Sequence, residues 1–202
     1  EANKAFNEQC VKVKMLLKAA SGSFSGGTYA SMQNVMLEAS KDAQVAKTLF
    51  NPYGLNPQGE CFGADKGDLK TVKFEADIGA WIMPFVMAAI NTRVVRRSHA
   101  LAGYPYGKDF QYEEAMVSGK GLIGRLKGYA GLAALGAIMA GKPDSLYKKV
   151  LNQFFPKPGE GPDKEEREAG FYKFIVVGVF RDGEIITAEI AGDRDPGYGS
   201  TS

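Results

Sequence analysis

Apolar and polar residues alternate along the segment 10–20, and this alternation predicts a β-strand. Val13 and Met15 fall on one face of such a strand, while Lys12 and Lys14 fall on the other. Successive side chains of a strand point to opposite faces. We therefore expect a half-buried strand whose lysines lie on the polar face.

Three later regions also have the character of strands. The segment 70–79 is a second strand candidate, and the segment 108–117 alternates again and is the third. The segments 171–180 and 184–191 flank an Asp-Gly pair, which is typical of a β-hairpin. We expect these last two segments to pair antiparallel.

Helical periodicity covers much of the remaining chain. The segment 28–42 carries an apolar stripe and is expected to be capped near Thr28. The segment 80–102 is strongly helical in pattern, with Pro84 in its first turn, where proline is tolerated. Further helices are expected at 43–50, 120–140 and 144–154 and within 163–168, and a long Gly- and Pro-rich loop is expected at 51–69.

These elements are intermixed without regular βαβ repeats. We therefore expect an α+β fold, in which a mixed, largely antiparallel sheet carries helices packed on one face. The chain is expected to form one domain over residues 1–202. Both ends resemble cuts from something longer, because a strand pattern begins almost at the start and the helix-cap signal after residue 192 is followed by no helix.

Composition limits the classes of function. Hydrophobic residues make up 45% of the 202 residues, enough for a substantial core, and the net charge of +2 does not favour nucleic acid as a partner. Cys10 and Cys61 are too few for a disulfide framework and are expected to be ordinary thiols in a reducing, cytoplasmic compartment. With His99 as the only histidine, no metal site is expected. The chain has no run of about 18 or more uncharged apolar residues, so we expect no membrane span.

Four stretches together resemble the saccharopine dehydrogenase-like oxidoreductases, including their trans-acting enoyl reductase branch. These stretches are FSGGTYASM, MPFVMAAINTRVVRRSHAL, PGEGPDKEEREAGFYK and GDRDPGYGST, and they run in order along nearly the whole chain. The resemblance implies an N-terminal Rossmann domain that binds NAD(P), followed by an α+β domain that the present chain would represent. It further implies that NAD(P) binds the full-length protein and not this chain alone, which we expect to be inactive.

The stretch SGSFSGGT at residues 21–28 joins a strand to a helix. It is neither a dinucleotide fingerprint nor a P-loop. Exposed N–H groups at a helix start can hold an anion, but a plain turn with a hydroxyl cap explains the same residues. Both interpretations stay open.

The arginines of INTRVVRRS form a second candidate site. Arg93 and Arg97 are four residues apart on one helix face, where two guanidinium groups could grip a carboxylate or phosphate. A solvated basic face is the alternative. His99 lies near the end of the same helix and is more easily explained by its position there than by catalysis.

The stretch GDRDPGYG is the third candidate. Pairing between acidic and basic residues could simply lock this loop, but the family resemblance implies that it leads back to the nucleotide-binding domain and lines a cleft. Tyr198 would then present its hydroxyl there. No catalytic residue is assigned, and the candidates for the substrate cleft are Ser25, Gly26, Gly27, Thr28, Asn91, Arg93, Arg97, Asp193, Arg194, Asp195 and Tyr198.

The uncharged stretch from Gly128 to Gly141 allows three interpretations. A buried or interface helix is favoured, because Gly124 and Gly128 permit close helix approach. Contact with a membrane surface or with an acyl chain is the alternative. The expected partners are accordingly the protein's own Rossmann domain, a second copy of the chain, or lipid.

Two functions of different classes follow. The first is the substrate-side domain of an NAD(P)-dependent oxidoreductase. The second is a non-catalytic interaction or lipid-associated domain that retains an enzyme fold, since fold alone does not establish function.

Overall fold

The computed structural model describes residues 9–22, 25–60, 63–139 and 156–200, together with residues 147, 150 and 153. The chain divides into two compact units. Unit 1 comprises Glu1–Lys18, Lys47–Leu132 and Phe174–Ile190, and unit 2 comprises Ala19–Ala46, Ala133–Lys173 and Ala191–Ser202.

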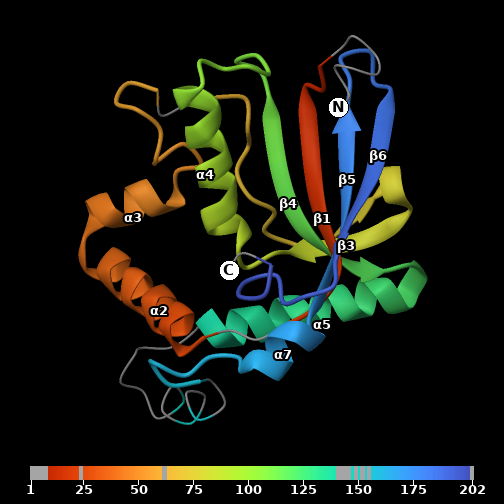
Figure 1. Cartoon of the computed structure of the whole chain (residues 1–202). Helices are drawn as coiled ribbons and strands as arrows, with labels where there is room; N and C mark the ends of the chain where they lie inside the picture. The colour runs from red at the N-terminus through yellow and green to blue at the C-terminus, as the bar shows by residue number, and fades with distance from the viewer. Residues whose placement is uncertain are drawn as a thin grey trace. The chain divides into compact units, whose positions relative to one another are not determined.

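A six-stranded sheet organises the fold, in the order β2-β3-β4-β1-β5-β6 (Figure 1). β1 pairs parallel with β4, whereas β3 pairs antiparallel with both β2 and β4. The backbone N–H of Val11, just before β1, donates to the carbonyl of Val179 at the end of β5, so β1 and β5 run in opposite directions. The strands are β1 (Lys12–Ser21), β2 (Lys73–Glu75), β3 (Ala80–Pro84), β4 (Gln111–Gly119), β5 (Phe171–Val179) and β6 (Ile185–Gly192).

The described part of the chain contains five α-helices and one short 3-10 helix, η1 (Ala76–Ile78). The α+β class with a mixed, mostly antiparallel sheet is thus confirmed. The expected helix 144–154 lies almost wholly outside the described residues. The helices are α2 (Gly26–Lys41), α3 (Ala43–Phe50), α4 (Ala88–Leu101), α5 (Gly121–Met139) and α7 (Lys164–Ala169).

The C-terminal hairpin is confirmed, because β5 and β6 are neighbours joined by a tight turn. Phe180 donates its N–H to the carbonyl of Glu184, and Gly183 adopts a φ of 92°, a left-handed conformation that suits glycine. The short charged helix is confirmed as α7. A capping box fixes its start, with the Asp163 side chain accepting from the N–H of Glu166 and the Glu166 side chain accepting from the N–H of Asp163.

The expectation of one helix over 80–102 is wrong at its beginning. Residues Ala80–Pro84 form strand β3, and α4 starts only at Ala88. The residue before a proline is disfavoured in the helical region, so Met83 resists helix formation. Pairing with β4 then secures the strand, with Ile82 opposite Val117 and Met83 opposite Met116.

The expectation that the lysines of β1 lie on the polar face of a half-buried strand is wrong for Lys14. Lys14 is only 6% exposed. Its ammonium group lies 2.8 Å from Oε1 of Glu75 and 2.6 Å from Oδ2 of Asp77. A buried charge is tolerated when it is paired, so these two carboxylates are what allow a lysine on a face that is buried in the fold.

The core of unit 1 lies in the centre of the sheet. Leu16 of β1, Ile82 of β3, Ala115 of β4 and Val177 of β5 are each 0% exposed and form one cluster. These residues come from four strands that are distant in the chain, so the core depends on the strand order rather than on any local segment.

The first turns of helix α5, which belong to unit 1, pack within that unit through two glycines. A Cβ atom on Gly124 would lie 2.2 Å from the backbone carbonyl of Gly119, and one on Gly128 would lie 2.8 Å from a methyl group of Val72. The Gly-x-x-x-Gly pair therefore serves close approach of the helix within unit 1. By contrast, Leu122, Ile123 and Leu126 are 61–70% exposed.

Among the described helices, α5 is also the one that is long and apolar enough to cross a membrane, with a mean hydropathy of 1.2. Core helices of soluble proteins have the same length and composition, so this property alone assigns no location.

We expect opposite effects from two alanine substitutions in α5. Gly124→Ala should lower the free energy of unfolding by about 1–3 kcal/mol, because its methyl group would overlap backbone atoms that cannot move aside. Gly136→Ala should raise it by about 0.5–1 kcal/mol, because open space surrounds that position and alanine favours a helix. Urea denaturation of both variants would measure the two changes, and equal changes would contradict this packing.

Candidate functional site

Helix α2 begins three residues earlier than its sequence pattern indicates. Ser25 is its N-cap, and the Ser25 side chain accepts a hydrogen bond from the N–H of Thr28 at 3.2 Å. Thr28, expected to be the cap, is instead in the first turn. The serine hydroxyl satisfies an N–H group that has no partner within the helix.

Three hydroxyl groups of unit 2 meet at this helix start. The Tyr198 hydroxyl donates to Oγ of Ser25 at 2.8 Å and lies 2.9 Å from Oγ1 of Thr28. We call Ser25, Thr28 and Tyr198 the hydroxyl cluster. It joins two of the stretches that the sequence singled out, although they lie 173 residues apart.

The hydroxyl cluster changes the acidity of its tyrosine. Hydrogen bonding with Ser25, and then with Thr28, holds the pKa of the Tyr198 phenol below its ordinary value. Both partners can donate to a phenolate oxygen, which favours the charged form. Tyr198 is half-buried, so this hydroxyl is not sealed inside the unit.

Asp195 organises the turn that carries Tyr198. It is 1% exposed, and its Oδ1 accepts from the N–H groups of Gly197 at 2.8 Å and Tyr198 at 2.7 Å. Asp193 and Arg194, which were predicted beside it, are exposed. Asp195 is therefore a positioning residue for Tyr198, whereas its two neighbours lie on the surface.

The glycines of the segment 21–28 serve close packing in unit 2. A Cβ on Gly22 would lie 2.2 Å from Oδ2 of Asp195, and one on Gly26 would lie 1.8 Å from the carbonyl oxygen of Lys157. A Cβ on Gly27, in contrast, would meet only Oγ of Ser25, at 3.7 Å.

The N–H groups at the start of α2 are largely engaged. That of Gly26 donates to the carbonyl of Glu160 at 2.9 Å, that of Thr28 to Oγ of Ser25, and that of Tyr29 to the carbonyl of Ser25 at 3.2 Å. These contacts favour the capped turn over an anion-binding loop. They also make this segment a poor fit for the pyrophosphate of a dinucleotide, which needs free N–H groups.

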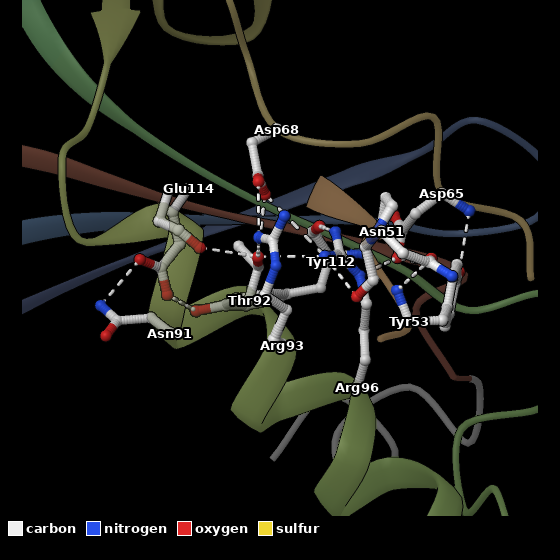
Figure 2. A network of polar contacts seen from close by, with 12 residues as sticks. Asn51, Tyr53, Asp65, Asp68, Asn91, Thr92, Arg93, Arg96, Tyr112 and Glu114 are labelled. Atoms are coloured by element: carbon white, nitrogen blue, oxygen red, sulfur yellow. Dashed lines mark hydrogen bonds and ion pairs between the residues drawn. The ribbon is translucent and has the colours of Figure 1, made fainter. Parts of the chain in front are cut away.

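The arginines of α4, in unit 1, have different environments. Arg93 is 6% exposed, and its Nη1 lies 2.6 Å from Oδ2 of Asp68 (Figure 2). Arg97 is exposed, and its Nη1 donates to the carbonyl of Leu55. The neighbour that shares the buried environment of Arg93 is Arg96, three residues along the helix.

Arg96 is the centre of a buried network. It is 4% exposed, and its Nε lies 2.7 Å from Oδ2 of Asp65. Its other nitrogens donate to Oγ1 of Thr92 at 3.0 Å and to the carbonyl of Tyr112 at 3.0 Å. Figure 2 shows these groups extending from α4 to β4 and to the loop 51–69. The network thus ties three segments of unit 1 together.

A buried carboxyl group continues the network along β4. Glu114 is 2% exposed and accepts from the Tyr112 hydroxyl and from the Asn91 amide, each at 2.9 Å. Burial raises the pKa of the Glu114 carboxyl, and burial together with the charge of Glu114 raises the pKa of the Tyr112 phenol. Asn91, a predicted site residue, therefore positions a buried acid.

On the other face of β1, Lys14 forms a separate buried set with Glu75 and Asp77. Burial alone would lower the pKa of Lys14, but hydrogen bonds to Asp77 and Glu75 raise it overall. Burial alone would raise the pKa of Glu75, but the hydrogen bond and charge of Lys14 lower it overall. Both groups are thus held in their charged forms, as expected of a structural ion pair.

His99 is packed among aromatic rings. Its Nε2 lies 2.8 Å from the carbonyl oxygen of Gly107, and its ring stacks on Tyr106 at 5.4 Å between centroids. Because a carbonyl oxygen only accepts, Nε2 carries the proton. No group of three or more potential metal ligands occurs among the residues that the structure describes.

Most residues of the buried network carry no clear signal in the sequence. Two acids of the network, Asp65 and Asp68, come from the loop 51–69, where aspartates suit solvent equally well, and Arg96 lies next to Arg97, which was chosen. The spacing of Arg93 and Arg96, at i and i+3, was the available signal. The omitted residues are Asp65, Asp68, Thr92, Arg96, Tyr112 and Glu114.

The chain is homologous to part of a class of oxidoreductases, the trans-acting enoyl reductases of mycobacteria. It is 34% identical over 208 residues to a Mycobacterium tuberculosis H37Rv protein named as a candidate trans-acting enoyl reductase, a match that covers 93% of this chain and 47% of that protein. It is 30% identical to the trans-acting enoyl reductase of Mycobacterium bovis BCG and 31% identical to that of Mycobacterium ulcerans, in each case over 88% of this chain and 44% of the relative.

The chain thus spans about half the length of the curated relatives it matches. No protein-family model matches it, and neither does any solved structure. The resemblance to trans-acting enoyl reductases is confirmed at this level, while the wider link to saccharopine dehydrogenases stays a prediction.

Proposed function

We propose that this chain is the substrate-side part of a nicotinamide-dependent oxidoreductase that reduces an enoyl group. The observation that carries the proposal is the similarity to trans-acting enoyl reductases over about nine-tenths of the chain. The convergence of Ser25, Thr28 and Tyr198 in unit 2 supports it, because it joins two stretches that also carry the family resemblance.

The cofactor is assigned to another part of the full-length protein. A nicotinamide cofactor supplies the hydride in such a reduction. The Gly-rich turn at residues 21–28, before α2, already uses its first N–H groups within unit 2. This turn is therefore a poor fit for the pyrophosphate of a dinucleotide.

Tyr198 is the best candidate for the chemistry of this chain. Reduction of an enoyl thioester adds a proton at the α-carbon and develops negative charge on the carbonyl oxygen. A hydroxyl group can donate to that oxygen or supply that proton. Tyr198 is half-buried, its pKa is lowered by its hydroxyl partners, and Asp195 holds its backbone in place.

The rival function is a non-catalytic domain that binds lipid or a partner. The exposed apolar side chains of α5 favour it: Leu122, Ile123 and Leu126 are each more than 60% exposed. A helix that is apolar on all sides is usually buried. A surface of this kind can also exist on an enzyme, so it is the weaker proposal.

The full-length protein tests both functions in one experiment. We expect loss of NADPH or NADH absorbance when a trans-2-enoyl thioester is added, with the saturated thioester identified by mass spectrometry. The isolated chain should show neither turnover nor cofactor binding. If the full-length protein binds anionic vesicles but neither binds the cofactor nor consumes it, the rival function is the correct one.

A further inference from the structure

Unit 1 contains a pocket of about 620 Å³ that the proposed chemistry does not use. Val94, Val95 and Ala102 of α4 and its C-terminal end form one wall, and Val13 of β1 and Tyr112 of β4 form the opposite one. These two sheet residues are paired in register, so they lie side by side. The pocket therefore lies between α4 and the sheet, and its volume is within the usual range for small-molecule sites.

The third side of the pocket is made by the segment that links α4 to β4. Pro105, Tyr106 and Phe110 line it from this segment, and His99 of α4 lines it as well. The rings of His99, Tyr106 and Phe110 lie 5.1–5.4 Å apart, centroid to centroid, and form one aromatic cluster. Aromatic contacts of this kind hold a loop in place without filling the space beside it.

Two buried polar groups of the lining are hydrogen-bonded, whereas the buried Nδ1 of His99 has no hydrogen-bond partner among the described residues. The Tyr112 hydroxyl donates to Oε1 of Glu114, and Nε2 of His99 donates to the carbonyl of Gly107. Burial raises the pKa of the Cys10 thiol, which keeps this half-buried lining residue neutral. Among the remaining lining residues, Gln9 and Ser98 are polar and exposed. Apart from Nδ1 of His99 and the exposed Gln9 and Ser98, the lining thus offers few hydrogen-bonding groups.

We propose that this pocket binds a single aliphatic chain, with the apolar tail between α4 and the sheet and the polar end toward Gln9 and Ser98. A mostly apolar wall rewards the burial of methylene groups, and it offers few hydrogen bonds to offset the desolvation of a polar ligand. The identity of the ligand rests on the proposed function, because an enoyl substrate with a long tail would supply such an aliphatic chain. The binding itself involves unit 1 alone.

Titration with saturated fatty acids of increasing length tests the proposal. If the tail enters the pocket, each added methylene should lower Kd about fourfold until the pocket is full, after which Kd should level off. Displacement of a fluorescent fatty acid would measure the series. A Kd that does not change with chain length would overturn the proposal, as would the absence of displacement.

A matched pair of variants locates the site. Ala102→Phe adds a ring at an exposed position that lines the pocket, so it should weaken binding of the longest acid by about tenfold or more. Leu101→Phe adds a ring at the neighbouring position, which is 63% exposed and does not line the pocket, and should leave Kd within about twofold. Circular dichroism should show both variants folded. If both variants lose affinity equally, or if neither does, the aliphatic chain binds elsewhere.

A second comparison distinguishes a free fatty acid from an acyl thioester as the source of the aliphatic chain. The same tail length is offered as a free acid and as a thioester. Equal affinity assigns recognition to the tail, whereas binding of neither contradicts the pocket. The reductase proposal is tested independently, because cofactor consumption with a short enoyl thioester needs no long tail. If the protein reduces the short thioester but does not bind the aliphatic chain, this inference alone is overturned.

Discussion

Replacing Tyr198 by phenylalanine in the full-length protein is expected to lower kcat for enoyl reduction by about a hundredfold or more. A positioned acid contributes about 10²–10⁴-fold to such a reaction, and this substitution removes only the hydroxyl. The free energy of unfolding should fall by no more than about 0.5–1.5 kcal/mol, because phenylalanine cannot form the hydrogen bonds to Ser25 and Thr28. Steady-state kinetics and urea denaturation of one preparation would separate the two effects.

Tyr129→Phe is the matched control for this result. Tyr129 lies on α5 and is 45% exposed, so the same change there should leave both kcat and stability almost unaffected. If Tyr198→Phe keeps full turnover, the hydroxyl cluster is a structural clasp around the N-cap of α2. If both variants lose turnover together, the effect does not come from the hydroxyl cluster.

Replacing Arg96 by leucine is expected to lower the free energy of unfolding by about 3–5 kcal/mol. Removing one partner of a buried ion pair leaves the other charge without compensation, and the Asp65 side chain is only 7% exposed. The carbonyl of Tyr112 and the hydroxyl of Thr92 would lose a donor at the same time. Denaturant titration followed by far-UV circular dichroism would measure the decrease.

Arg97→Leu provides the control at the next position. Arg97 is exposed and contacts the carbonyl of Leu55, so its replacement should change the free energy of unfolding by no more than about 1 kcal/mol. Similar decreases in the two variants would show that the charge of α4, rather than the buried network, is what stabilises unit 1. A double variant, Arg96→Leu with Asp65→Leu, should recover part of the stability, because it leaves neither charge unpaired.

Local patterns were sufficient where an element is decided by its own residues. The helix α3 has the bounds expected from the sequence, and the capping box of α7 involves two residues three apart. The β5–β6 hairpin follows from an Asp-Gly turn between two apolar strands. In each case the interactions that decide the conformation lie within a few residues, so the sequence signal is direct.

The wrong expectation over Ala80–Pro84 arose where a short apolar run suits either a helix or a strand. The proline after Met83 favoured the strand, and its pairing with β4, more than thirty residues later, decided it. The expectation that Lys14 lies on the polar face of a half-buried strand was wrong for a similar reason. Nothing near Lys14 in the chain indicates that Glu75 and Asp77 will enclose its ammonium group.

The candidate site residues also divide into those whose contacts followed from the sequence and those whose contacts did not. Ser25, Thr28, Asp195 and Tyr198 were selected from two stretches and meet in unit 2. Arg93 and Asn91 were selected as ligand-facing groups and instead pair with Asp68 and Glu114 inside unit 1. That the stretches at 25–28, 91–97 and 193–198 share one cleft stays a prediction.

The sequence by itself determined the α+β class, the hairpin, most helix positions and the resemblance to enoyl reductases, because these depend on local periodicity and on short motifs. Only the tertiary structure decided which polar residues are buried, which of them are paired, and where space remains between α4 and the sheet. Burial and pairing depend on what lies opposite a residue in space. The sequence around Arg96 is the same whether its side chain contacts water or the carboxylate of Asp65.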